Sequence, residues 1–190
     1  MVRRVCVVTG SRAEYGVLKG LMSLIKKSNF LNLQIVVTGA HLSPEFGNTF
    51  EIIHKDGFTI NKKVDMLLSA DSDRGISKSI GLGIIGFSDA FHDLRPDIIL
   101  LTGDRYEMVA ASIAASISKI KIAHLHGGEV TKGAYDDAFR HSITKMAHLH
   151  FVATPSYRNR VIQMGEQPET VINVGGLSID AISNTKILSK

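Results

Sequence analysis

Short apolar strands alternate with helical patterns along the 190 residues of this chain, and the alternation predicts an α/β fold. The strands are nearly continuous apolar runs, which is typical of a parallel sheet covered by helices on both faces. Right-handed crossovers between such strands give a doubly wound, Rossmann-like sheet. We therefore expect about six or seven strand–helix units.

Each expected strand is a run of aliphatic and β-branched residues that ends at a turn signal. The clearest run is DIILLT and the weakest is INKKV. The strands are expected, in order, at Val5–Thr9, Leu33–Thr38, Ile60–Val64, Asp97–Thr102, Ile120–Leu125, His150–Ala153 and Thr170–Val174.

The expected helices repeat apolar residues at three- and four-residue spacing. In the first helix these residues are Val17, Leu18, Leu21, Leu24 and Ile25. The later helices are expected at Thr49–Asp56, residues 76–94, Met108–Ser118, Asp137–His148 and Ser156–Met164.

The helix expected at residues 76–94 follows a polar loop at Ala70–Gly75 and ends before Pro96. It contains Gly81, Gly83 and Gly86, each of which costs about 1 kcal/mol relative to alanine. Close packing against another element is the favoured explanation, and close approach of a ligand is the alternative.

Composition argues against several classes of protein. The net charge is +4, but lysine and arginine are scattered, so no nucleic-acid partner is expected. The single cysteine, Cys6, can form no intrachain disulfide and is expected to be a small buried side chain. There is no apolar run of roughly 20 residues and no signal-peptide core, so we expect a cytoplasmic protein without membrane contact.

Polar residues gather directly after three of the expected strands, in TGSRAEYG (9–16), TGDRYE (102–107) and HLHGGE (124–129). The carboxyl ends of parallel strands form the ligand-binding edge of an open α/β sheet. The glycines are expected to expose backbone N–H groups to an anion at the start of the following helix.

Neither common nucleotide-binding loop is present. Arg12 stands where G-x-G-x-x-G requires its second glycine, and G-x-x-x-x-G-K-[ST] does not occur. Dinucleotide and P-loop folds are therefore disfavoured, and no cofactor is expected. Arg12 is placed to meet phosphate or uracil oxygens, and a surface arginine at a helix start is the alternative.

Acidic residues in these segments are candidates for acid–base chemistry. Asp104 follows a strand and a glycine, and its alternative role is the N-cap of the next helix. Glu129 has no helix directly after it, so capping does not explain it. Asp136 and Asp137 begin a helix, where the helix dipole gives at least one of them a structural explanation.

The motif HLH occurs twice, at His124–His126 and at His148–His150. Alternate residues of a strand face the same side, so each pair is a candidate metal site of the kind found in a metallohydrolase. No H-E-x-x-H motif accompanies them, and packing or capping explains such imidazoles better. We expect no metal.

Four motifs, TGSRAEYG, LLTGDRYEM, HLHGGE and DDAFRHSITKMAHLHF, resemble the N-terminal half of the hydrolysing UDP-N-acetylglucosamine 2-epimerases. The resemblance covers essentially the whole chain. Non-hydrolysing relatives typically carry threonine at the position of Arg105, HVEAG in place of HGGE and PEE in place of DD. The resemblance therefore indicates the hydrolysing branch, which supplies N-acetylmannosamine or a related sugar for sialic-acid and legionaminic-acid synthesis.

The resemblance implies a role for each motif residue. The catalytic acids would be Asp104, Glu129 and either Asp136 or Asp137. The substrate-binding residues would be Arg12, which would contact the UDP portion, together with Glu14, Arg105, His126, Arg140 and His141.

The resemblance also implies a GT-B architecture, in which two Rossmann-like halves enclose a UDP-sugar. Residues 1–180 would form the N-terminal half, and residues 181–190 would begin an interdomain linker. The C-terminal half would be absent, so the chain alone is expected to be inactive or nearly so. Related enzymes form homodimers through this half, and the candidate helices are Ile76–Asp89 and Met108–Ser118.

The implied reaction explains the need for several acids. Loss of UDP from C1 acidifies the C2 proton, which one carboxylate removes while another stabilises the oxocarbenium-like carbon. Water then adds to the glycal and gives the manno sugar. Packing the acids together is expected to raise the pKa of at least one toward neutrality.

Three alternative functions accompany this interpretation. In the first alternative, the protein is an epimerase whose substrate is UDP-N,N'-diacetylbacillosamine in place of UDP-N-acetylglucosamine. The second is half of another GT-B sugar-nucleotide transferase, which needs an acceptor base but no acid cluster. The third is a non-catalytic module whose acids only cap helices and whose surface binds a partner protein.

Overall fold

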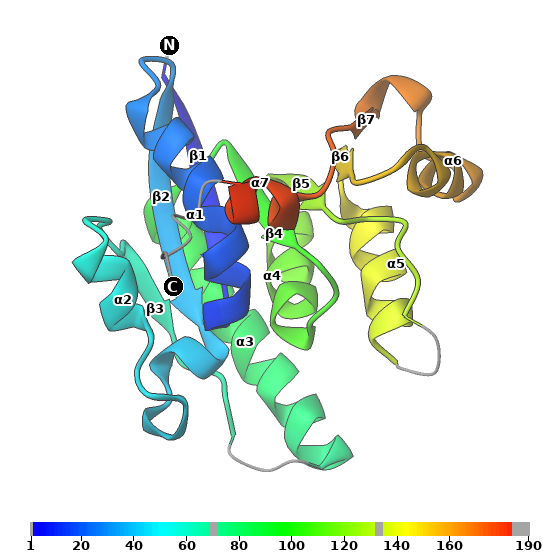
Figure 1. Ribbon diagram of the computed structural model, residues 1–190. Coiled ribbons are helices and arrows are strands. Elements are labelled where there is room, and N and C mark those ends of the chain that lie inside the picture. The colour runs from blue at the N-terminus through cyan, green and yellow to red at the C-terminus, as the bar shows by residue number, and fades with distance from the viewer. Residues whose placement is uncertain (1, 69–71, 132–134, 184–190) are drawn as a thin grey trace, which may run out of the picture.

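A parallel sheet runs through the computed structural model, which describes residues 2–68, 72–131 and 135–183 (Figure 1). Among these residues the sheet has seven strands in the order β3-β2-β1-β4-β5-β6-β7, and every neighbouring pair is parallel. The strands are β1 Arg3–Thr9, β2 Leu31–Thr38, β3 Lys62–Val64, β4 Ile98–Thr102, β5 Lys121–Leu125, β6 Leu149–Val152 and β7 Val171–Asn173.

The strand order reverses between β1 and β4, which pair side by side with Val5 opposite Ile98. From β1 the chain moves outward through β2 to β3, and it then returns to β4 and moves the other way. Crevices at such a reversal, beyond the carboxyl ends of the strands, are the usual ligand sites of doubly wound sheets.

Helices cover both faces of the sheet (Figure 1). Successive strand residues point to opposite faces, so Val5 and Val7 of β1 join one apolar core while Cys6 and Val8 join the other. The first core lies under α1 (Arg12–Lys27) and α2 (Phe50–Lys55). The second lies under α3 (Asp73–Leu94), α4 (Tyr106–Ile117) and α5 (Asp136–Met146), and α6 (Pro155–Gln163) packs on β6 and β7.

The predicted doubly wound α/β fold is confirmed, and each predicted strand and helix is present with shifts of a few residues at its ends. The prediction of a polar loop as far as Gly75 is wrong. Helix α3 begins at Asp73, because the side chain of Ser72 accepts a hydrogen bond from the N–H of Gly75 and caps the helix. Residues 69–71 of that loop lie outside the described residues.

Several short elements were not predicted. Three 3₁₀ helices lie at Gly39–Leu42, Pro44–Phe46 and Pro168–Thr170. Helix α7, Leu177–Ser183, packs against α1 and continues across the predicted domain boundary at residue 180. The rest of the predicted linker, residues 184–190, lies outside the described part of the chain.

The structure confirms one expectation that came from composition, a buried cysteine. Cys6 is fully buried, and burial raises the pKa of its thiol to about 12. In the ranges that the structure describes, no helix is long and apolar enough to cross a membrane.

The glycines of α3 differ in their surroundings. A Cβ atom on Gly83 would lie 2.9 Å from the Cβ of Ala110 and 2.7 Å from the Cε of Met66, and one on Gly86 would lie 2.7 Å from a methyl group of Val64. Close packing, the favoured explanation, is therefore confirmed at these two positions. A Cβ on Gly81 would meet no atom within 4 Å, so packing does not explain that glycine.

We expect Gly83→Ala to lower the free energy of unfolding by about 1 to 2 kcal/mol, because overpacking outweighs the gain in helix propensity. Gly81→Ala is the matched control in the same helix. It meets no neighbour and is expected to raise stability by up to about 1 kcal/mol. Urea denaturation of both variants measures the difference, and equal effects would show that packing at Gly83 is not limiting.

Candidate functional site

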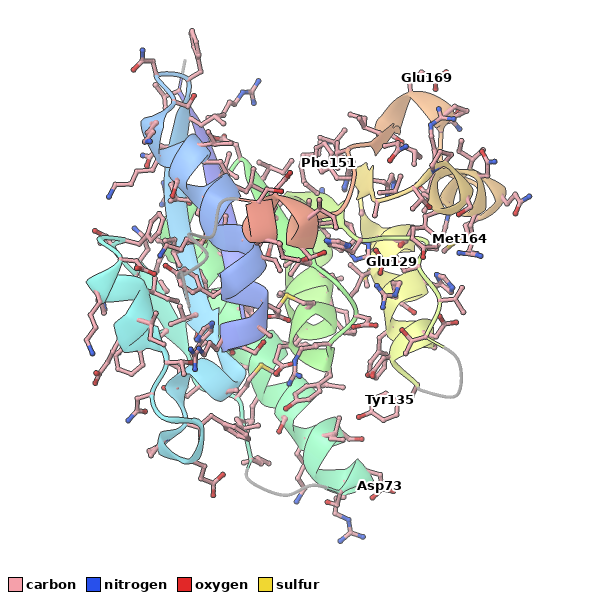
Figure 2. All side chains as sticks on the ribbon, in the orientation of Figure 1. Asp73, Glu129, Tyr135, Phe151, Met164 and Glu169 are labelled. Atoms are coloured by element: carbon pink, nitrogen blue, oxygen red, sulfur yellow. The ribbon has the colours of Figure 1, made fainter. Side chains whose placement is uncertain are left out.

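A cavity of about 730 Å³ lies at the carboxyl-end edge of the sheet, beside the reversal of strand order. Ser11 after β1 and Arg105 and Tyr106 after β4 contribute to its lining, and Tyr135 and Asp136 border it at the start of α5. Figure 2 shows Tyr135 at this end of α5, on the same side of the molecule as Asp73 at the start of α3.

Arg140 is the cation of an acidic cluster in the loops that follow β4 and β5. Its side chain is only 7% exposed, and it forms ion pairs with Asp104 and, at 3.6 Å, with Glu129. It also donates hydrogen bonds to the carbonyl of His126 at 3.0 Å and to the hydroxyl of Thr131 at 3.1 Å. Helix α5 thus brings one guanidinium to the loops that follow β4 and β5, and the structure brings together the predicted residues Asp104, Glu129, His126 and Arg140.

The turn after β5 places His126 against Glu129. His126 has a φ of +63°, a left-handed conformation that is uncommon for a residue with a side chain. Its Nδ1 lies 2.7 Å from the Oε1 atom of Glu129. Burial raises the pKa of Glu129, but the hydrogen bond from His126 and the charge of Arg140 outweigh burial, and the net pKa is lower than usual. The expectation that clustering raises the pKa of an acid is therefore wrong for Glu129, because cations lie among the acids.

Asp136 and Asp137 have different surroundings. Asp137 accepts a hydrogen bond from the backbone N–H of Thr131 at 3.0 Å and lies 3.5 Å from His141. Asp136 borders the cavity, and its carboxylate has no hydrogen bond or ion pair within the described residues. Asp137 therefore has a structural explanation, whereas Asp136 is free to meet a ligand.

Asp104 does not cap the helix that follows it. The N-cap residue of α4 is Arg105, and no side chain caps this helix. Asp104 instead contacts Arg140 and, at 3.4 Å, the hydroxyl of Thr131. The N-cap explanation is wrong, and the carboxylate belongs to the acidic cluster.

The loop after β1 was expected to have free N–H groups for an anionic ligand, and the structure differs from this expectation. The Oε2 atom of Glu14 accepts hydrogen bonds from the N–H groups of Gly10 at 2.6 Å and Ser11 at 3.2 Å, and Ser11 caps the helix in return. Burial raises the pKa of Glu14 to about 7. A carboxylate of the chain itself therefore occupies the start of α1, and substrate contact by Glu14 stays a prediction.

Two predicted arginines lie beside this loop. Arg12 is exposed in the first turn of α1, and its side chain has no partner among the described residues. Arg105 forms an ion pair at 2.8 Å with Glu107, whose side chain is fully buried. Burial alone lowers the pKa of Arg105, but Glu107 more than compensates and the net pKa is raised, so the arginine stays charged.

The histidine pairs do not form metal sites. His126 lies beyond the end of β5 and His148 precedes β6, so neither HLH motif keeps the geometry of alternate strand residues. His124 is buried, with Nε2 donating to the carbonyl of Gly103 at 2.8 Å and Nδ1 3.1 Å from Thr144. His150 lies 3.2 Å from Glu166. In the described part of the chain, no group of three or more His, Cys, Asp or Glu side chains could hold a metal ion.

Sequence reasoning missed three polar residues of this region. Thr131 bridges Asp104 and Arg140, and His124 supports the glycine directly before Asp104. Glu107 reads in sequence as one more acid in the first turn of a helix, where the dipole explains it. The one sequence signal for an ion pair was that Glu107 lies two residues after Arg105.

The comparison with known proteins decides the family. A sequence profile described as UDP-N-acetylglucosamine 2-epimerase matches residues 23–190. The chain belongs to the UDP-N-acetylglucosamine 2-epimerase family. It is 46% identical over 188 residues to the GDP/UDP-N,N'-diacetylbacillosamine 2-epimerase (hydrolyzing) of Campylobacter jejuni, covering 99% of this chain and 49% of that protein. It is 41% identical over 186 residues to the UDP-N,N'-diacetylbacillosamine 2-epimerase (hydrolyzing) of Legionella pneumophila, covering 98% and 49%.

The fold matches this family as well. The crystal structure of the UDP-GlcNAc 2-epimerase of Neisseria meningitidis bound to UDP-GlcNAc superposes with a TM-score of 0.83 at 22% identity, over 95% of this chain and 48% of that one. The chain has the fold of one Rossmann-like half of the GT-B architecture, as predicted. It spans about half the length of the curated family members it matches.

We expect Arg140→Gln to lower the free energy of unfolding by about 2 to 4 kcal/mol, because it leaves two half-buried carboxylates without a cation. Removing the guanidinium also removes a charge that lowers the pKa of Glu129, so that pKa is expected to rise. Urea denaturation and NMR titration of the Glu129 carboxyl group measure the two effects. Lys55→Gln, at an exposed ion pair, is the control and is expected to change stability by less than about 0.5 kcal/mol.

The raised pKa of Glu14 predicts how the stability of the fold depends on pH. Its pKa is about 7 in the folded chain and 4.5 when exposed, so the unfolded chain loses this proton first as the pH rises. Its contribution to stability is therefore lost between these pH values. Relative to Glu14→Gln, we expect the unfolding free energy of the unaltered chain to fall by on the order of 1 to 3 kcal/mol. Parallel stability curves for the two proteins from pH 4 to pH 8 would contradict this.

Proposed function

We propose that this chain is the N-terminal half of a hydrolysing UDP-sugar 2-epimerase, which releases UDP and the 2-epimeric sugar. The observation that carries the proposal is the acidic cluster of Asp104, Glu129 and Arg140 in the loops after β4 and β5, where the next residue after Asp104, Arg105, lines the cavity. Family membership and the names of the two relatives support the same reaction.

The reaction has two stages, and both need acids. In the first, a carboxylate takes the proton from C2 while the C1–O bond breaks, so the electrons of the C2–H bond form the C1=C2 bond and UDP leaves with the electrons of the broken bond. In the second, water adds its hydroxyl to C1 and C2 receives a proton on the opposite face. The sugar leaves with the configuration at C2 inverted.

The surroundings of the acids suit different roles in these stages. Glu129 has a lowered pKa, so it is ionised at neutral pH and suits stabilisation of positive charge at C1. Asp104 is held by Arg140 and suits the same task. Asp136, which borders the cavity without a partner in the described ranges, suits transfer of the proton at C2.

We propose UDP-N,N'-diacetylbacillosamine as the first substrate to test, with UDP-N-acetylglucosamine second. Two of the relatives, at 46% and 41% identity, carry the diacetylbacillosamine name, whereas another at 41% identity is named polysialic acid biosynthesis protein P7. One wall of the cavity is apolar and includes Phe46, Leu67, Leu68 and Ile76, which suits the C6 methyl group and the added acetamido group of that sugar. UDP-N-acetylglucosamine has hydroxyl groups at both places and would give N-acetylmannosamine, the sugar used for sialic acid.

The second domain and the homodimer stay predictions. Exposed aliphatic side chains on the two helices proposed for dimer contact are consistent with the dimer, since Ile85 of α3 is 65% exposed and Ile117 of α4 is 82% exposed. A C-terminal half of GT-B type would close over the cavity and provide the remaining contacts to UDP.

The test is turnover by this chain joined to the C-terminal half of the Campylobacter relative, with the chain alone assayed beside it. UDP release and NMR of the sugar product are measured with each UDP-sugar. We expect the joined protein to release UDP and the manno sugar, and the chain alone to be nearly inactive. Asp136→Asn is expected to lower kcat by about 100-fold or more, because a proton-transfer group is lost.

Controls separate the alternatives. Asp93→Asn, at an exposed ion pair with Lys62 on α3, is expected to keep full turnover. UDP release that requires an added acceptor would indicate a transferase. A folded joined protein that turns over neither sugar would contradict the proposed function, and normal turnover by Asp136→Asn would contradict the role given to Asp136.

A further inference from the structure

Glu107 is a fully buried acid whose carboxylate meets one cation. The Nη2 atom of Arg105 lies 2.8 Å from its Oε1 atom, and the Nε atom of Arg105 lies 3.1 Å from its Oε2 atom. This is a two-point contact between a planar guanidinium and a carboxylate, which fixes orientation as well as distance. Because a buried charge is costly without a partner, Glu107 and Arg105 hold one another in place.

Two glycine loops leave room for this carboxylate. Gly39, directly after β2, has a φ of +56°, and a Cβ atom there would lie 2.7 Å from the Oε1 atom of Glu107. A Cβ on Gly10, after β1, would lie 3.5 Å from the same atom. The loops that follow β1 and β2 are therefore shaped around Glu107, although its side chain does not reach the surface.

The bound guanidinium keeps one edge free of Glu107. The side chain of Arg105 is 44% exposed, and its guanidinium carbon lies 5.8 Å from the ring centre of Tyr106. Arg105 lines the cavity together with Ser11 and Tyr106. The free edge thus provides charged N–H donors on the cavity wall, where an anionic ligand would find them.

Part of the neighbouring helix start is already occupied by a carboxylate of the chain. In doubly wound folds the N–H groups at the start of the first helix commonly bind phosphate. Here the N–H groups of Gly10 and Ser11 bind Glu14, at 2.6 Å and 3.2 Å. Glu14 thus takes two N–H groups at this corner of the cavity, and among the described residues that line the cavity Arg105 is the one cation.

We propose that Glu107 is a positioning residue that holds Arg105 as a diphosphate contact of the cavity, beside the turn where Glu14 takes the N–H groups of Gly10 and Ser11. The proposal rests on the proposed function, since the anion is the diphosphate of a UDP-sugar. Glu107 does not touch the ligand. Its effect on binding passes through the orientation of Arg105.

The experiment measures binding of UDP and of inorganic pyrophosphate to the 190-residue chain by calorimetry. The variants are Glu107→Gln, Arg105→Gln and the double variant, which removes both charges together and leaves neither unpaired. We expect each of the three to weaken pyrophosphate binding by about tenfold and to lie within about threefold of the others, because all three lose the same contact. Glu51→Gln, also in the first turn of a helix but exposed, is the matched control and is expected to bind as the unaltered chain does.

A structural role alone would lower the melting temperature without this pattern, so thermal unfolding is followed for every variant. If Glu107→Gln does not fold, Glu107→Asp takes its place, because it keeps the charge but shortens the reach to Arg105. The inference is overturned if the unaltered chain binds neither UDP nor pyrophosphate. It is also overturned if Glu107→Gln binds pyrophosphate normally, or if its effect persists undiminished when Arg105 is already glutamine.

The outcomes separate this inference from the proposed function. Suppose that the 190-residue chain shows the expected binding pattern but the joined protein turns over no UDP-sugar. That result contradicts the epimerase proposal and leaves the role of Glu107 standing. If the joined protein turns over a UDP-sugar but Glu107→Gln binds pyrophosphate with unchanged affinity, the epimerase proposal stands and the role given to Glu107 is contradicted.

Discussion

Arg140 holds the acidic cluster together, since Asp104 and Glu129 lie close enough to share one guanidinium. Without that cation the loops after β4 and β5 would bring like charges together in a half-buried place, which is unfavourable. The guanidinium also binds the carbonyl of His126, so the backbone of the left-handed turn is held by the same group. Helix α5 owes its position over β5 partly to these contacts and partly to the buried Ile143.

A second guanidinium and a second pair of acids lie at the loop after β4 and the start of α1. Arg105 forms an ion pair with Glu107, while Glu14 accepts hydrogen bonds before α1. The two arginines differ in one respect. Arg140 is enclosed by its partners, whereas Arg105 keeps part of its guanidinium toward the cavity. The parallel sheet makes this possible, because β1, β4 and β5 deliver their following loops to one edge.

The fold could be predicted from the sequence because its strands are short, apolar and separated by glycine or proline signals. The start of α3 was missed because Ser72 and Asp73 read equally well as a loop and as a helix cap. Helix α7 was missed because a helix of seven residues gives too few turns for a periodic pattern.

The candidate site could be predicted in part. The acids after β4 and β5 were found because strand ends mark the ligand edge of such a sheet. Arg140 was predicted as a substrate contact but not as the partner of these acids, and Thr131 was not predicted, because both reach Asp104 only through packing between elements far apart in the chain. The same limit hid Glu107, whose burial depends on two turns in other loops.

The pairing of both arginines with protein carboxylates has an entropic consequence. A free arginine side chain has many rotamers, and ordering it costs about 2 kcal/mol. Both arginines are ordered during folding, so a ligand that arrives in the cavity meets Arg105 already in place. The entropy lost when the arginine side chain is ordered therefore lowers the stability of the domain and does not lower the affinity for a ligand.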